Sequence, residues 1–302
     1  MKLTNIFSML GGLALFLYGM NMMSNGLELA AGNKMKTILE KLTSNRILGV
    51  LVGALVTAII QSSSATTVMV VGFVNSGLMS LTSAVWVIMG ANIGTTITGQ
   101  LIAIDITAIA PLIAFIGVAM IVFFKSKKLD AFGSVIGGLG ILFIGMETMS
   151  NAMVPLRTMP EFVGLISKFQ NPFIGILVGA LFTALIQSSS ASVGILQALA
   201  KSGVMTLSSS IYVLFGQNIG TCITSVLASI GTSKNAKRTT IIHLTFNIIG
   251  TVIFVSISML FPFAHLVESI TPNNVAAQIA NVHTIFNVAK SILIVKVSFT
   301  ST

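Results

Sequence analysis

Long apolar stretches separated by short polar segments dominate this chain of 302 residues. Seven of the stretches are about 20 residues long, the length that an α-helix needs to cross the hydrocarbon core of a membrane. They are residues 6–27, 81–104, 106–124, 132–152, 211–230, 240–260 and 277–297. The pattern therefore predicts an all-α membrane protein with seven crossings.

Two further pairs of apolar segments are too short to cross. Residues 47–60 and 65–74 flank the polar sequence QSSS, and the same arrangement returns within residues 172–200. Apolar runs of about 10 to 14 residues are typical of re-entrant segments. We therefore expect two helical hairpins, at about residues 46–76 and 171–202, each of which enters and leaves the membrane on one side.

The two expected hairpins belong to an internal repeat. QSSSA begins at Gln61 and again at Gln187 (187 − 61 = 126), and NIGT begins at Asn92 and again at Asn218 (218 − 92 = 126). When residues 45–98 are aligned with 171–224, 28 of the 54 positions are identical. We predict a first repeat in residues 1–126 and a second in 127–260, followed by a loop and a last membrane helix in 261–302.

The first repeat contains an odd number of predicted crossings, so the second is expected to lie upside down in the membrane. Lys and Arg positions test this, because short cytoplasmic loops carry an excess of them. One face of the predicted topology receives Lys34, Lys36, Lys41, Arg46, Lys125, Lys127, Lys128, Lys234, Lys237 and Arg238. The other face receives Lys2, Arg157, Lys168 and Lys201. The N-terminus is then expected outside and the C-terminus inside, with the first hairpin opening inward and the second outward.

The composition excludes several classes of protein. Hydrophobic residues make up 54% of the chain and charged residues 8%, and the mean hydropathy is +0.99, which excludes a soluble globular domain. The net charge of +9 comes from residues that flank apolar stretches, and one Trp and two Tyr provide no stacking platform. Nucleic-acid binding is therefore not expected. No acid is placed to orient a His beside a Ser, so we do not expect an enzyme.

The chemistry of each expected hairpin is concentrated at its tip. The first helix of a hairpin ends at the Gln and presents backbone carbonyls, and the second begins at the serines and presents N–H groups. One tip can therefore hold a cation and an anion together, with help from the serine hydroxyls. An alternative is that the serines only let helices pack closely. Matching breaks in two inverted halves favour a transporter's substrate site.

A second pair of polar breaks interrupts two predicted crossings. GANIGTTIT at residues 90–98 matches GQNIGTCIT at 216–224, and the glycines are expected to loosen the helix around an Asn and a Thr. We expect Asn92, Thr95, Asn218 and Thr221 to face the site. The alternative is two Gly-kinked helices whose Asn and Thr side chains bond each other.

The breaks contain no Lys, Arg, Asp or Glu. An oxyanion brought to this depth would need bound cations to balance its charge, which is the physical basis of symport. Hydroxyls and amides without a fixed base favour sodium over protons. Thr66 and Thr96 of the first repeat correspond to Ser192 and Cys222 of the second, so the site is expected to be asymmetric.

Two HxxFN segments contain His243 with Asn247 and His283 with Asn287. The spacing places each pair on one face of a helix. Two His could bind a metal, but no carboxylate or thiol accompanies them at ligand spacing, so hydrogen bonding between helices is preferred.

The paired QSSS hairpins, NIGT segments and HxxFN segments closely resemble those of the type II sodium-phosphate cotransporter family, and the chain looks like a bacterial member over about residues 12–287. The resemblance implies sodium-driven uptake of inorganic phosphate by alternating access across the cytoplasmic membrane, which is the inner membrane of such a cell. It makes the candidate phosphate ligands Ser62, Ser63, Ser64, Ser188, Ser189, Ser190, Thr95 and Thr221. The candidate sodium ligands are Gln61, Gln187, Asn92, Asn218, Thr66 and Ser192.

The expected partners are thus phosphate, sodium as the coupling ion and the lipid bilayer, with no other cofactor or metal. A homodimer is the commonest symmetric assembly if the protein is oligomeric. Many bacterial members of the family carry a cytoplasmic helical domain after the membrane region. Because the chain ends at Thr302, we expect this domain to be absent. An ion-coupled carrier of another oxyanion, such as sulfate or a dicarboxylate, a passive anion channel and a non-transporting scaffold remain as alternatives.

Overall fold

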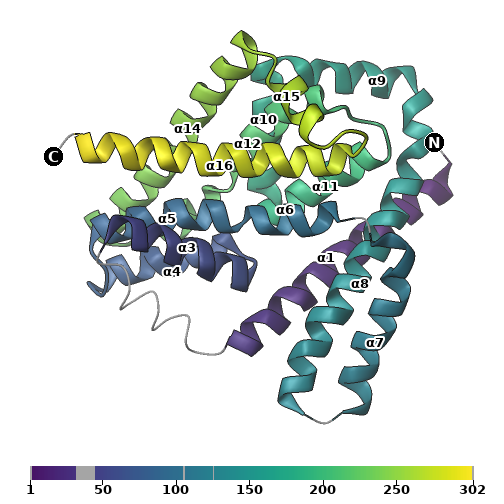
Figure 1. Ribbon diagram of the computed structural model, residues 1–302, viewed down its shortest axis with the longest axis horizontal. Helices are drawn as coiled ribbons and strands as arrows, with labels where there is room; N and C mark the ends of the chain where they lie inside the picture. The colour runs from purple at the N-terminus through teal and green to yellow at the C-terminus, as the bar shows by residue number, and fades with distance from the viewer. Residues whose placement is uncertain (1, 32–44, 105, 125, 301–302) are drawn as a thin grey trace.

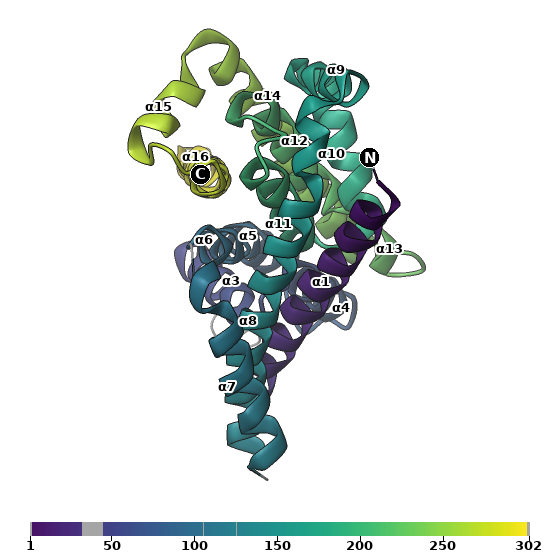
Figure 2. The ribbon, with the colours of Figure 1, turned by 90° about the vertical axis from the view of Figure 1, so that its right-hand side faces the viewer.

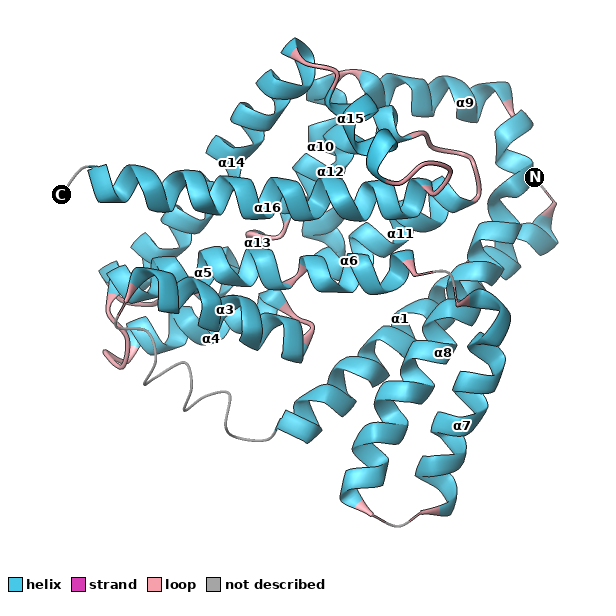
Figure 3. Cartoon of the chain, in the orientation of Figure 1, coloured by secondary structure: helices cyan, strands magenta, loops and turns pink. Residues whose placement is uncertain are grey.

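The computed structural model describes residues 2–31, 45–104, 106–124 and 126–300. Every regular element in these ranges is a helix, and none of them is a strand (Figure 3). The prediction of an all-α protein is therefore confirmed. Four residues used to predict the orientation, Lys34, Lys36, Lys41 and Lys125, lie outside these ranges.

Six helical segments in the described ranges are long and apolar enough to cross a membrane. They are Leu3–Ala31 (α1), Leu81–Ala103 (α5 Leu81–Gly94 and α6 Thr96–Ala103), Lys127–Thr158 (α8 Lys127–Met153 and η2 Val154–Thr158), Leu207–Ala228 (α12 Leu207–Gly220 and α13 Ile223–Ala228), Lys234–Leu260 (α14) and Val275–Lys296 in α16 (Val275–Thr300). These segments correspond to six of the seven predicted crossings, which supports a multi-pass membrane protein.

The seventh predicted crossing, residues 106–124, is shorter than predicted. The 3-residue η1 (Thr107–Ile109) is followed by the 14-residue α7 (Ala110–Phe123), and both flanking residues leave the helical conformation. Ile106 has φ −108° and ψ 17°, and Phe124 is extended. Residues 107–123 are thus at the lower end of the length that a crossing needs, and the seventh crossing stays a prediction.

Short helices form the rest of the fold. They are α3 (Arg46–Ile60), α4 (Ser63–Asn75), α9 (Pro160–Ser167), η3 (Lys168–Gln170), α10 (Pro172–Ile186), α11 (Ser189–Lys201) and α15 (Phe263–Ile270). Only Gln61 and Ser62 separate α3 from α4, and only Gln187 and Ser188 separate α10 from α11. The segment Pro160–Gln170 meets α10 at a bend of 103°.

The helices form two adjoining groups (Figure 1). In both views, α1, α7 and α8 lie side by side in a group that projects from the body (Figures 1 and 2). The other helices form the body, in which α16 runs beside α5 and α6 and α12 packs against α10, α11, α14 and α16. A buried aromatic cluster fixes this part of the core, with Phe215 stacked on Phe286 and Phe254 edge-on to both.

Glycines bring the helix backbones close together. On α1, Gly12 lies against the backbone of Gly145 and Met149 of α8, and Gly19 lies against that of Gly138 and Leu142. A Cβ at Gly12 would lie 2.8 Å from the Gly145 carbonyl oxygen, closer than real Cβ atoms approach an oxygen. Small residues at such interfaces maximise van der Waals contact, which is a main attraction between helices in lipid.

The same close packing occurs at corresponding positions of the two sequence repeats. Gly53 of α3 lies against the Val87 carbonyl of α5, and Gly179 of α10 lies against the Val213 carbonyl of α12. In the opposite direction, Gly90 of α5 and Gly216 of α12 lie against the carbonyl groups of Val50 and Ile176. The first helix next to each QSSS segment is therefore fixed against the helix that carries NIGT.

Replacing Gly90 or Gly216 by Ala is expected to destabilise the protein, because the added methyl group would meet a backbone carbonyl that cannot rotate away. We expect a loss of about 1–3 kcal/mol, the usual penalty for overpacking, measured as a lower melting temperature in detergent. Gly72→Ala is the matched control, since no atom lies within 4 Å of its new Cβ position. A Gly90→Ala variant with the same melting temperature as the wild type would contradict this account of the packing.

Candidate functional site

The tips between the paired short helices have the same local structure. Gln61 and Gln187 end α3 and α10 in the left-handed conformation, with φ of 58° and 59°. The next residues, Ser62 and Ser188, are extended and cap the following helices by accepting hydrogen bonds from the N–H groups of Ala65 and Ala191. A left-handed residue followed by a capping serine ends one helix and begins the next within two positions.

Hydroxyl groups from the two tips meet inside the protein. Ser63 Oγ and Ser189 Oγ lie 3.1 Å apart, and both side chains are buried. Thr95 Oγ1, between α5 and α6, lies 3.3 Å from Ser189 Oγ and 3.4 Å from Ser190 Oγ. Ser64 Oγ of the first tip donates to the Gln187 carbonyl of the second at 3.3 Å. The structure therefore brings together five predicted site residues with hydroxyl side chains, and we call Ser63, Ser64, Thr95, Ser189 and Ser190 the hydroxyl cluster.

The two glutamines differ in their surroundings. Gln61 is 5% exposed, and its Oε1 accepts a hydrogen bond from Thr98 Oγ1 at 2.8 Å. Thr98 also accepts from Ser190 Oγ at 3.3 Å, so Gln61 is connected to the hydroxyl cluster. The side chain of Gln187 is exposed. Only the first of the two predicted glutamine ligands is therefore buried next to the cluster.

Five predicted residues bond outside the cluster. Thr66 bonds Thr57 at 3.0 Å, and Ser192 bonds Thr183 at 2.6 Å, so each ties together the two helices of its tip. Asn218 donates to the Leu214 carbonyl, and Thr221 donates to the Gln217 carbonyl, both within their own helix. Asn92 donates to the Ile88 carbonyl and lies 3.3 Å from His243 Nε2.

The interruptions at the NIGT segments are narrower than predicted. One residue, Thr95, separates α5 from α6, and Thr221 and Cys222 separate α12 from α13. All three keep helical φ and ψ values, and the Thr95 N–H still bonds the Ala91 carbonyl. The expected loosening around each Asn is therefore absent, because the flanking glycines are held by close packing.

A cavity of about 460 Å³ opens beside both tips. Gln61, Ser62 and Ser188 line it from the tips, and Asn21, Asn25 and Glu28 line it from α1. Ser24 of α1 also borders the cavity and donates to the Ile60 carbonyl at the end of α3, at 2.6 Å. The volume lies in the range of small-molecule sites.

The structure identifies two polar residues that the sequence prediction did not select. Thr98 connects Gln61 to Ser190, and its recurrence as Thr224 at the same offset was a signal for it. Lys290 is 1% exposed and bonds Asn247. A lysine inside a predicted crossing marks a functional position by default.

The first HxxFN segment connects the two NIGT-bearing helices. His243 of α14 lies 3.3 Å from Asn92 of the first and 3.2 Å from Ser225 Oγ in α13 of the second. This confirms hydrogen bonding between helices for His243. Among the described residues no group of three His, Cys, Asp or Glu side chains could hold a metal ion. His283 lies against Gly99 of α6, and its Nδ1 has no partner in the described part of the chain.

Known proteins are similar in sequence to this chain over most of its length. A family model described as Na+/Pi-cotransporter matches residues 15–151 and 158–271. YqeW of Bacillus subtilis (strain 168) is 32% identical over 285 residues, which cover 92% of this chain and 90% of that protein. No solved structure matches the chain.

Relatives of two kinds have names that mention phosphate. The "Putative inorganic phosphate export protein YjbB" of Salmonella typhimurium is 28% identical over 87% of this chain and 48% of that protein, so the chain spans about half its length. "Sodium-dependent phosphate transport protein 2A" of Rattus norvegicus is 40% identical over 105 residues, 34% of this chain and 16% of that protein. Because the family model covers most of the residues, the chain belongs to the Na+/Pi-cotransporter family, a family of membrane transporters.

Proposed function

We propose that this protein is a symporter that carries inorganic phosphate into the cell together with sodium, by alternating access across the cytoplasmic membrane. The observation that supports this most strongly is the meeting of the two tips, where Ser63 Oγ and Ser189 Oγ lie 3.1 Å apart. Two helices that begin at one buried point form an anion site from two parts of the chain.

Phosphate would bind at the N-termini of α4 and α11. Each capping serine satisfies one N–H group of the first helical turn, which leaves others free to donate to an oxyanion. Hydroxyls of the hydroxyl cluster add further donors, since a Ser or Thr hydroxyl can turn its hydrogen toward a ligand. The proposed phosphate ligands are Ser62, Ser63, Ser64, Ser188, Ser189, Ser190, Thr95 and Thr221.

Charge balance favours coupling to a cation. A helix N-terminus is equivalent to about half a positive charge, so two of them offset about one negative charge. Inorganic phosphate is a mixture of monoanion and dianion at neutral pH, and the dianion carries two negative charges. Part of the charge is therefore left unbalanced in a site whose cluster and tips contain no charged side chain.

Sodium would bind at oxygen atoms around the same tips. Gln61 contributes a buried amide oxygen, and the carbonyl groups at the ends of α3 and α10 carry partial negative charge. The proposed sodium ligands are Gln61, Gln187, Asn92, Asn218, Thr66 and Ser192. Since the side chains of Asn92, Asn218, Thr66 and Ser192 bond elsewhere, their participation requires rearrangement when sodium binds.

Alternating access follows from the proposed arrangement of the halves. Residues 1–126 and 127–260 would form two inverted repeats with re-entrant hairpins at about 46–76 and 171–202, the N-terminus outside and the C-terminus, after 261–302, inside. The recurrence of the glycine contacts and of the tip geometry supports an equivalent role for the two halves. The cavity beside α1 would be the path by which phosphate and sodium reach the tips from one side.

A specific observation favours a second candidate, phosphate export. The relative YjbB is named for export and is similar to most of this chain. Sodium symport would move phosphate into a cell that keeps its sodium low, whereas exchange of phosphate for sodium would move phosphate out.

Uptake of labelled phosphate into proteoliposomes separates these functions. With purified protein, an inward sodium gradient is expected to drive accumulation of phosphate above its external concentration, because both ions move in the same direction. Potassium in place of sodium serves as the control.

Each other result identifies a different function. Accumulation driven by an outward sodium gradient would establish exchange and therefore export. Flux that ignores the gradient would indicate a passive channel, and preferential competition by sulfate or a dicarboxylate would indicate another oxyanion. No flux of any of these would support the scaffold alternative.

Ser63→Ala and Ser189→Ala are each expected to lower phosphate uptake by about tenfold or more, since each removes a hydrogen bond to a charged ligand. The rate of uptake at low phosphate concentration measures the loss. Ser76→Ala is the matched control, because Ser76 lies at the exposed end of α4 and bonds only the Phe73 carbonyl within its own turn. Uptake at the wild-type rate in both cluster variants would exclude this site.

Gln61→Ala and Gln187→Ala are expected to differ in their effect on sodium binding, because the two side chains have different surroundings in this conformation. Gln61 is buried and bonded to Thr98, whereas the Gln187 side chain is exposed. We expect Gln61→Ala to raise the sodium concentration for half-maximal phosphate binding more than Gln187→Ala does. Equilibrium binding of labelled phosphate to detergent-solubilised protein, titrated with sodium, measures this, and equal shifts would contradict the asymmetry.

A further inference from the structure

Lys290 is a buried charge in the interior of α16. Its side chain is 1% exposed, and among the described residues it is the only Lys, Arg, Asp or Glu that is buried. It lies inside the segment Val275–Lys296, which is long and apolar enough to cross a membrane. An ammonium group at such a depth is costly and needs partners that stabilise it.

The partners of Lys290 are those of a cation. Its Nζ donates to Asn247 Oδ1 at 2.5 Å. The same atom lies 4.6 Å from the centroid of the Phe246 ring and 4.4 Å from that of Phe286, within the range of cation–π attraction. No carboxylate in the part of the chain that the structure describes forms an ion pair with it. The group is therefore solvated by an amide and two rings but is not neutralised.

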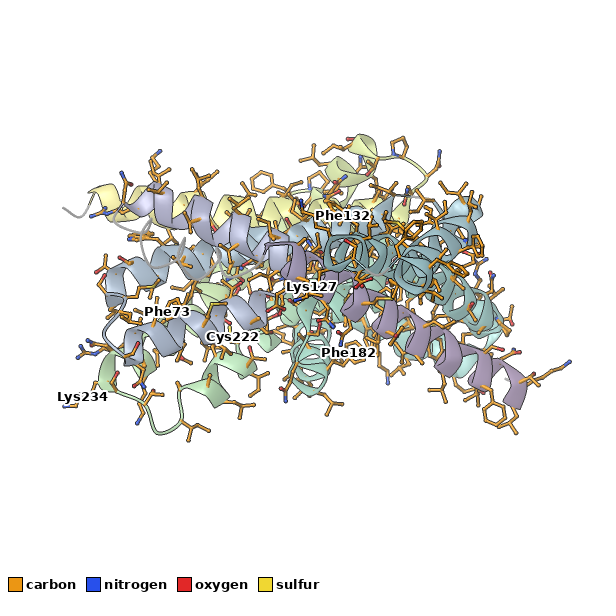
Figure 4. All side chains as sticks on the ribbon, turned by 90° about the horizontal axis from the view of Figure 1, so that it is seen from below. Phe73, Lys127, Phe132, Phe182, Cys222 and Lys234 are labelled. Carbon is orange, nitrogen blue, oxygen red and sulfur yellow. The ribbon has the colours of Figure 1, made fainter. Side chains whose placement is uncertain are left out.

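Asn247 connects this charge to the second interrupted helix. Its Nδ2 donates to Cys222 Sγ at 3.2 Å, and its Oδ1 faces Lys290. Cys222 follows Thr221, a proposed phosphate ligand, and lies inside the body of the protein, whereas Lys234 points away at its edge (Figure 4). The ammonium is thus held one amide away from the interruption between α12 and α13.

The titratable neighbours of Lys290 do not cancel its charge. His243 Nε2 lies 3.3 Å from Asn92 Nδ2, and His243 Nδ1 lies 3.2 Å from Ser225 Oγ. An imidazole ring is either neutral or positively charged, so His243 cannot offset a positive charge. The other titratable side chains that line this part of the core are His283 and the buried thiol of Cys222.

We propose that Lys290 is a fixed positive charge that helps to balance the transported phosphate, as a positioning residue that acts through Asn247 and the second interrupted helix. The inference rests on the proposed function. Two helix N-termini leave about one negative charge of a phosphate dianion unbalanced. With its amine protonated, Lys290 would supply a counter-charge, and bound sodium would supply the remainder.

A fixed positive charge has opposite effects on the two transported ions. It attracts phosphate and repels sodium, so its removal weakens phosphate binding and strengthens sodium binding. Removal of a residue needed only for folding would weaken the binding of both phosphate and sodium, or would lower the amount of folded protein. The direction of the two shifts therefore distinguishes an electrostatic role from a structural one.

The test compares the wild type with Lys290→Met, which keeps the length and removes the charge, in proteoliposomes. We expect the half-saturation constant for phosphate, at saturating sodium, to rise about tenfold. The half-saturation constant for sodium, at saturating phosphate, is expected to fall severalfold. Lys296→Met is the matched control on the same helix, because Lys296 is exposed and its charge is screened by solvent, and both constants are expected to stay within about twofold of the wild type.

Asn247→Asp keeps the proposal testable if Lys290→Met does not fold. It places a carboxylate beside the ammonium without removing the lysine, so it neutralises the same charge. As in Lys290→Met, the half-saturation constant for phosphate is expected to rise and that for sodium to fall. The proposal would be overturned if the variant that folds has the wild-type constants for both ions. It would also be overturned if the constants for phosphate and sodium both rise or both fall. If neither variant folds, Lys290→Arg provides the test, because it retains the positive charge. A stable Lys290→Arg variant whose phosphate and sodium constants shift in opposite directions by more than tenfold would overturn the proposal.

The proposed function fails in a different way. Wild-type protein without sodium-dependent phosphate uptake would contradict symport itself, and the role of Lys290 would fall with it. Sodium-dependent uptake in the wild type together with an unaffected Lys290→Met variant would remove only the role of Lys290.

Discussion

Two helices begin side by side in the interior of an apolar protein, and the need to satisfy their first N–H groups constrains the rest of the structure. Unpaired N–H groups at membrane depth cost several kcal/mol each. Ser62 and Ser188 satisfy one N–H group per helix, and the hydroxyls of Ser63, Ser189 and Thr95 lie within hydrogen-bonding distance of one another at the same point. The arrangement is stable without a ligand because the hydroxyls bond one another, and it suits an anion because each hydroxyl can turn to donate to one.

This arrangement requires close backbone packing around it. A short helix that ends in the interior has few turns with which to fix its position, so α3 and α10 are held by contacts in which glycine meets carbonyl. The same glycines explain why Thr95 and Thr221 keep helical dihedral angles. Each helix is fixed on the N-terminal side of its interruption, by Gly90 and Gly94 or by Gly216 and Gly220, and only one or two residues lose their regular pattern.

Much of the site could be predicted from the repeat, and the remainder depended on tertiary packing. The offset of 187 − 61 = 126 is also the separation of Ser63 and Ser189, whose hydroxyls meet. Equivalent serines can touch in this way when two copies pack with their tips together. The sequence could not show that Asn92 turns toward His243, because a helical Asn can bond its own turn, a ligand or a neighbouring helix. Lys290 lies in the last helix but outside the repeated QSSS, NIGT and HxxFN segments, so no repeat pointed to it.

The difference between the two glutamines is informative because the two tips are otherwise alike. Equal sequence, equal φ and equal capping would place Gln61 and Gln187 in equal surroundings if the two halves were packed identically. Gln61 is buried against Thr98, and Gln187 is exposed, so the packing around the tips differs. In the proposed alternating-access mechanism, exchanging the surroundings of the two tips would move the opening from one side of the membrane to the other at a small difference in free energy. The cavity beside α1 would then belong to one state, and the contact of Ser24 with the Ile60 carbonyl would be among those that change.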